Sequence, residues 1–308
     1  MRITGVLAVA LLAGCATPPA NTLLDSDGTA QTLKELMARR DKIVHLSPSP
    51  VEMGKPVLLL LHGATDDPTE MMNIVREWRE KYDVFLYSYN YHHRIDKVAS
   101  DLVREIKKLK AENSHREPMT VLVYSYSAIL FRDTVIIADD PALFAGVSLV
   151  QLVPTAGGSY LARTMRHPLT AWLVSLASKP SAAENPYGRF ARQIWAGEGN
   201  QKFYEAIAPQ RIHTLVLEGD SHSLAGVKNE DVQQRYKNGL GPNVVVIPAS
   251  AGVTHEYFPT EPAALQYVRK LLELLTDNAI SGREQAAGPT QGHRNTEAFV
   301  STATAIVR

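Results

Sequence analysis

The chain has 308 residues, of which 32 are Lys or Arg and 32 are Asp or Glu, so its formal net charge is zero. A neutral chain has no overall field that draws it onto polyanions, and we therefore expect no nucleic-acid role. Hydrophobic residues make up 45% of the chain, which is normal for a globular protein and excludes disorder throughout. The length suits a single α/β domain, which is the starting assumption.

The first fourteen residues, MRITGVLAVALLAG, have the pattern of an export signal. One positive charge at Arg2 precedes an apolar stretch from Ile3 to Ala13, which is too short to span a bilayer. The single cysteine, Cys15, follows directly, so no disulfide can form within one chain. Residues 1–14 are therefore predicted to be a signal peptide.

The segment from Leu12 to Cys15 (LAGC) resembles the lipobox of bacterial lipoproteins. The resemblance implies that Cys15 takes a diacylglyceryl thioether, and that its amine is acylated once the signal has been cut. Several acyl chains are what stable anchoring needs. Ala16 in place of Asp favours the outer membrane, by resemblance to enterobacterial sorting, so we expect a lipid-anchored protein of the cell envelope. The alternative is an ordinary secretory signal with a chance cysteine.

Strand and helix patterns alternate after a small, polar tether at 15–31. A short helix is expected at 32–40 and a short strand at 42–46. Unbroken or near-unbroken apolar runs, typical of strands buried on both faces, predict the main strands. These strands cover 56–61, 83–89, 119–124, 146–153, 213–218 and 243–248. Helices are predicted at 68–81, at 95–111, after the strand at 119–124 through 138, near 229–237 and at 261–275.

This alternation predicts an α/β fold with a doubly wound, mostly parallel sheet and helices on both faces. The predicted domain covers 32–277. Within it, 157–208 is rich in Pro, Gly and aromatic residues and is expected to form a small helical cap. Residues 278–308 lack a periodic apolar face, apart from a short end, and are expected to be a disordered tail.

The run from Val121 to Ile129 (VLVYSYSAI) passes straight from a strand into a helix. It resembles the nucleophile elbow of the α/β-hydrolase superfamily, whose usual pattern is G-x-S-x-G. With Ser125 as nucleophile, Y-S-Y-S-A is similar to the Y-S-Y-G-A of that family. With Ser127, the bulky Ile129 falls where the family has a small residue. The resemblance favours Ser125 and leaves Ser127 as the alternative nucleophile; neither register has both glycines.

His62 and Gly63 follow the first strong strand, where the resemblance places a loop of the oxyanion hole. It implies that the backbone N–H groups of Ala64 and Tyr126 are the two donors. For the base it points to His255, in the loop after the last strand. Asp220 is the nearest carboxylate after the strand at 213–218 and is the expected acid, with Glu218 and Asp231 as alternatives.

The resemblance implies a lipase- or esterase-like serine hydrolase that acts on a small-molecule acyl or ester substrate through an acyl-enzyme. Aromatic residues of the cap would shape an apolar acyl pocket; they are Trp172, Tyr187, Phe190 and Trp195. No cofactor and no metal are expected, because His92 and His93 are adjacent and lack a carboxylate at ligand spacing. The rival interpretation is a catalytically inactive lipoprotein of the same fold that binds a lipid, a glycan or an envelope partner. The oligomeric state is left open.

Overall fold

The computed structural model describes residues 40–46, 55–63, 68–90, 93–112 and 119–152, the backbone of 214–218 and 244–248, and six helical positions between 265 and 273. The predicted signal peptide, tether, cap and tail lie outside the described residues. So do the helix predicted near 229–237 and, except for Arg40, the helix predicted at 32–40.

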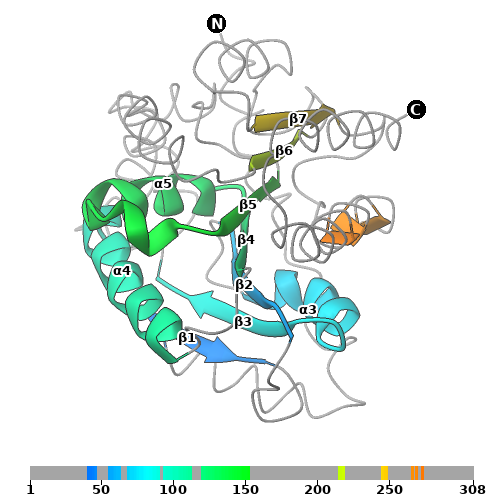
Figure 1. Cartoon of the computed structure of the whole chain (residues 1–308), viewed down its shortest axis with the longest axis horizontal. Coiled ribbons are helices and arrows are strands. Elements are labelled where there is room, and N and C mark those ends of the chain that lie inside the picture. The colour runs from blue at the N-terminus through cyan, green and yellow to red at the C-terminus, as the bar shows by residue number, and fades with distance from the viewer. Residues whose placement is uncertain are drawn as a thin grey trace, which may run out of the picture.

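The strands of the described part of the chain form one mixed sheet (Figure 1). The order across the sheet is β1-β3-β2-β4-β5-β6-β7. β1 at the edge runs antiparallel to β3, and all the other neighbours are parallel. The mostly parallel sheet predicted from the sequence is therefore confirmed. The strands are β1 (Lys42–His45), β2 (Val57–Leu61), β3 (Asp83–Ser88), β4 (Met119–Tyr124), β5 (Val147–Leu152), β6 (Thr214–Glu218) and β7 (Val244–Pro248).

Helices cover both faces of this sheet, as the alternation predicted (Figure 1). The helices are η2 (Pro68–Met71), α3 (Met72–Trp78), α4 (Ile95–Glu112), α5 (Ser127–Ala138) and η3 (Pro141–Phe144). α3 packs on one face, and α4 and α5 pack on the other. The helical positions between 265 and 273 lie on the α3 side, where Val268 and Leu272 are buried.

The two halves of the core explain why β2 is apolar at every position. Val57, Leu59 and Leu61 point into the cluster under α4 and α5, whereas Leu58 and Leu60 point into the cluster under α3. Successive side chains of a strand point to opposite faces, so in a strand covered on both sides every side chain is buried and apolar residues are favoured throughout. This packing fixes the register in which β2 and its neighbours present their carboxyl ends.

Two differences of more than one residue at a boundary separate the predicted elements from those observed. The helix predicted at 68–81 begins as the 3-10 helix η2, and α3 ends at Trp78, after which the chain turns into β3. η3 was not predicted. α5 ends at Ala138, as predicted, and the residue after it, Asp139, has a φ of 44°; Asp tolerates this left-handed conformation better than most residues. None of these differences moves a strand.

Candidate active site

The candidate site lies at the carboxyl ends of β2 and β4, which are parallel neighbours in the sheet with Leu61 paired to Val123. The chain leaves β2 toward β3 on one side of this pair and leaves β4 toward β5 on the other. Where strand connections diverge in this way, an α/β sheet has a crevice in which ligands bind. His62 and Ser125 follow these two strands directly.

Ser125 lies at a sharp bend between β4 and α5, which are separated only by Ser125 and Tyr126. Its φ is 54°, in the left-handed region that non-glycine residues rarely adopt. The Ser125 N–H donates to the Leu152 carbonyl at 3.0 Å, and the Ala128 N–H donates back to the Ser125 carbonyl at 3.2 Å. The bend therefore continues the sheet ladder on one side and starts the helix on the other.

Ser127, the other serine of the motif, has a different setting. It is fully buried, and its Oγ lies 2.9 Å from the carbonyl oxygens of both Leu61 and Tyr124. The same Oγ accepts a hydrogen bond from the Tyr124 N–H at 2.8 Å. These contacts attach the first turn of α5 to the ends of β2 and β4, which is a structural task.

Tyr126 stands between the two serines and is the N-cap residue of α5. The Ile129 N–H donates to its carbonyl at 2.9 Å. N–H groups at the start of a helix have no partner in the intrahelical ladder and carry partial positive charge, so they suit a developing oxyanion. The side chain is almost fully buried, and this burial, followed by the charge of Asp133, raises the pKa of the Tyr126 phenol. The phenol therefore stays neutral at all ordinary pH values.

His62 is fully buried at the end of β2, with its ring turned back toward the protein. Its Nε2 accepts a hydrogen bond from the Tyr89 N–H at 3.2 Å, and its Nδ1 lies 3.0 Å from the Gly63 carbonyl. An Nε2 that accepts leaves the proton on Nδ1, which can then donate to that carbonyl. The ring therefore stabilises the loop instead of acting on a substrate. Ala64 lies outside the described residues.

The predicted triad partners Asp220 and His255 also lie outside the described residues, as do Cys15, Asp231 and the cap aromatics. The structure does describe the backbone of the strands that precede Asp220 and His255. β6 ends at Glu218 and β7 at Pro248, and both run parallel to β4. Carboxyl ends of parallel strands meet at one edge of a sheet, so the segments after β6 and β7 start from the same edge as Ser125.

One residue that contacts this region was missed in the sequence. Tyr89 follows β3, and its hydroxyl lies 2.6 Å from the His62 carbonyl oxygen and 3.0 Å from the Gly63 carbonyl oxygen. The available signal was its place at the end of a strand beside β2. Without the sheet order, however, the last tyrosine of the run DVFLYSY is indistinguishable from an ordinary strand residue.

Within the described ranges, no three His, Cys, Asp or Glu side chains come together in a way that could hold a metal ion. His93 Nδ1 lies 3.4 Å from the Asp41 carboxylate, and His92 is not described. Among the described helices, none combines the length and apolar character needed to cross a membrane.

Comparison with solved structures gives matches over most of the chain. A haloalkane dehalogenase loop variant from Bradyrhizobium elkanii superposes with a TM-score of 0.54 at 13% identity, covering 79% of this chain and 99% of that one. The chain has an α/β-hydrolase fold.

Two further similar structures have lower scores. A lipase from Bacillus licheniformis has a TM-score of 0.49 at 13% identity, covering 77% of this chain and 99% of that one. A thermophilic esterase from Thermogutta terrifontis has a TM-score of 0.48 at 13% identity, covering 75% and 92%. No protein-family model matches this chain, and no curated protein matches its sequence.

Proposed function

We propose that the chain is a serine hydrolase that cleaves a carboxylic ester or a related acyl bond through an acyl-enzyme intermediate. The observation that carries the proposal is Ser125, a non-glycine residue with a φ of 54° on a strand-to-helix bend at the carboxyl edge of the sheet. A left-handed conformation costs a non-glycine residue about 1–2 kcal/mol. Backbone strain of this kind gathers at functional positions, where the surrounding structure holds a side chain in place for chemistry.

The nucleophile in this proposal is Ser125 and not Ser127. Ser127 Oγ is fully buried and contacts three main-chain atoms of β2 and β4. Freeing this oxygen for attack would break the contacts that attach the first turn of α5 to these strands. Ser125 lies instead on the turn itself, before the helix begins. Ser125 directly follows the carboxyl end of β4, and this end of the strands is where ligands bind in open α/β sheets, which supports its choice as nucleophile.

The remaining parts come from the resemblance described above. Ser125 Oγ attacks the acyl carbonyl carbon while His255 takes its proton, and Asp220 holds His255 in the required tautomer. The N–H groups of Ala64 and Tyr126 stabilise the oxyanion. His255 then gives its proton to the leaving group. In the second half, His255 takes a proton from water, the hydroxide attacks the acyl carbon, and the bond to Ser125 Oγ breaks as His255 returns the proton to that oxygen.

The decisive experiment is labelling with a fluorophosphonate probe, which phosphonylates an activated serine. We expect the wild type and Ser127→Ala to be labelled and Ser125→Ala to be unlabelled, with turnover of a short-chain ester following the same order. Label that persists in Ser125→Ala and vanishes in folded Ser127→Ala would move the nucleophile to Ser127. A folded wild type that takes no label and turns over no ester would refute the hydrolase and favour the rival binding role.

The triad partners are tested in the same assay. His255→Ala is expected to abolish turnover, because a serine hydroxyl without a base is a weak nucleophile. Asp220→Asn is expected to lower kcat strongly while leaving binding largely unchanged, because the histidine is then held in the wrong tautomer. If Asp220→Asn retains wild-type kcat, the acid is elsewhere, and Asp231→Asn and Glu218→Gln are the next variants.

We also propose that Cys15 is lipidated and holds the protein at the bacterial envelope, in the outer membrane. The support is the LAGC pattern after a short apolar stretch. In cells given labelled palmitate, the wild type is expected to take up label and to sediment with membranes. Cys15→Ala should do neither; membrane association that survives this change would overturn the anchor.

A further inference from the structure

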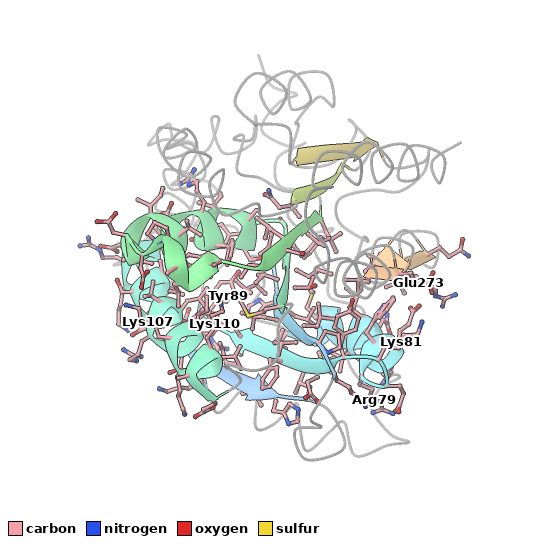
Figure 2. All side chains as sticks on the ribbon, viewed as in Figure 1. Arg79, Lys81, Tyr89, Lys107, Lys110 and Glu273 are labelled. Carbon is pink, nitrogen blue, oxygen red and sulfur yellow. The ribbon has the colours of Figure 1, made fainter. Side chains whose placement is uncertain are left out.

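We propose that Tyr89 is a positioning residue that holds the His62–Gly63 loop in the orientation an oxyanion hole requires. Tyr89 follows β3, and its side chain is buried in the interior of the domain (Figure 2). It contacts both loops of the candidate site without belonging to either of them. The kinetic part of this inference rests on the proposed function, whereas the structural part does not.

The hydroxyl of Tyr89 is the first contact. It lies 2.6 Å from the His62 carbonyl oxygen and 3.0 Å from the Gly63 carbonyl oxygen. In a trans peptide unit the carbonyl and the following N–H point in opposite directions. Holding the Gly63 carbonyl toward Tyr89 therefore sets the direction of the N–H in the same peptide unit, which is the N–H proposed to bind the oxyanion.

The main chain and the ring of Tyr89 provide the second and third contacts. The Tyr89 N–H donates to His62 Nε2 at 3.2 Å, and the two rings are stacked with centroids 4.2 Å apart and planes 14° from parallel. Because Nε2 accepts, Nδ1 carries the proton and can donate to the Gly63 carbonyl, 3.0 Å away. His62 Nδ1 and the Tyr89 hydroxyl, whose one proton is shared with the His62 carbonyl, thus both contact the Gly63 carbonyl.

The ring of Tyr89 also reaches the turn after β4. Its centroid lies 6.4 Å from that of Tyr126, within the range of an aromatic pair. Tyr126 is the residue whose N–H is the second proposed oxyanion donor. One side chain from β3 therefore packs against the residues that set both donors, and it can keep them in register with each other.

Donors that are already in place stabilise charge in the transition state without first reorganising. Loosening them should reduce kcat and leave KM nearly unchanged, because the ground-state carbonyl depends little on them. We expect Tyr89→Phe, which keeps the ring and removes only the hydroxyl, to lower kcat roughly 10-fold or more with KM within about twofold of wild type.

Tyr87→Phe is a matched control. Tyr87 lies in β3 two residues before Tyr89, is buried in the same core cluster, and donates through its hydroxyl to the Val98 carbonyl in α4 at 3.2 Å. Both variants lose one buried hydroxyl, but only Tyr89→Phe loses a contact with the His62–Gly63 loop. Hydrogen–deuterium exchange of a peptide covering this loop should rise in Tyr89→Phe and stay at the wild-type rate in Tyr87→Phe.

Equal loop exchange and equal kcat in the two variants would overturn the proposal. If the wild type shows no turnover, the proposed hydrolase has failed, and the exchange comparison alone still decides whether Tyr89 holds the loop. Should Tyr89→Phe not fold, His62→Gln removes the stacked ring and the Nδ1 contact from the other side of the pair. A folded His62→Gln with wild-type loop exchange and wild-type kcat would likewise overturn the proposal.

Discussion

Ser127 Oγ lies 2.9 Å from the carbonyl oxygen of Leu61, a contact that joins the first turn of α5 to the last residue of β2. A hydroxyl has one proton, so it donates either to Leu61 or to Tyr124 at any moment, while it also accepts from the Tyr124 N–H. The two loops of the candidate site start within a few residues of this contact. It therefore fixes the distance between them.

Ser127→Ala should lower the free energy of unfolding by about 1–3 kcal/mol, because it leaves a buried main-chain N–H and buried carbonyls without their partner. Thr134→Val is the control: Thr134 is also fully buried, but its Oγ1 donates to the Leu130 carbonyl within the same helix at 2.7 Å. The Leu130 carbonyl belongs to the hydrogen-bond ladder of the helix itself, so the loss of unfolding free energy in Thr134→Val should be smaller. Urea denaturation measures both, and equal losses would contradict a role for Ser127 between elements.

The left-handed conformation of Ser125 leads to a second prediction about stability. Ser125→Gly and Ser125→Ala both remove the hydroxyl, but only glycine adopts a φ of 54° without steric cost. The glycine variant should be more stable than the alanine variant by about 1 kcal/mol. Thermal or urea denaturation of the two proteins gives the comparison. An alanine variant as stable as the glycine variant would mean that Ser125 does not have a positive φ in solution.

The strands were predictable because their signal is local. Runs such as Leu58 to Leu61 are apolar at every position, which is typical of a strand buried on both faces. What was not predictable is the partner of each strand. β3 lies beside β2 and β1 runs antiparallel at the edge, and both facts depend on contacts between distant segments. The role of Tyr89 followed from that order and was therefore missed.

The motif at the end of β4 was recognisable, but its register was not decided by sequence. Ser125 and Ser127 have different neighbouring residues, and neither serine has both of the glycines that flank the nucleophile in the family pattern. The structure distinguishes them by physical setting: one is on a left-handed bend, and the other is packed against Leu61 and Tyr124. The predicted partners Asp220 and His255 stay predictions, because they lie outside the described residues.

The helical segment near the C-terminus of the domain should contribute strongly to stability. Leu272 is fully buried beside α3, and its carbonyl accepts a hydrogen bond from the Tyr82 hydroxyl at 3.2 Å. Lys81 and Glu273, 3.6 Å apart at the surface, lie on the same side (Figure 2). An exposed pair of this kind contributes little, so the buried leucine should dominate.

Leu272→Ala is therefore expected to cost about 2–5 kcal/mol, through lost burial and the cavity that remains. Leu265→Ala is the matched control, since Leu265 belongs to the same helical segment but is only partly buried against the same cluster. Its cost should be clearly smaller. Comparable destabilisation of the two variants in urea would show that the segment does not pack on α3 as described.

Asp133 on α5 gives a prediction about pH. Its carboxylate accepts a hydrogen bond from Arg132 Nε at 2.8 Å, yet burial outweighs this partner and raises the pKa of Asp133 above its ordinary 3.8. Between 3.8 and the raised value, the folded protein holds a proton that the unfolded chain has lost. The contribution of Asp133 to stability is therefore fully present below 3.8 and is lost as the pH rises through the folded pKa.

Asp133→Asn removes this titration and keeps an acceptor for Arg132, so the variant provides the reference. The stability of wild type minus that of Asp133→Asn should fall as the pH is raised from below 3.8 to neutrality, whatever its starting value. Urea denaturation of both proteins at a series of pH values measures the difference. If the difference instead grows with pH, Arg132 outweighs burial, and the carboxylate is held in its charged form by the ion pair.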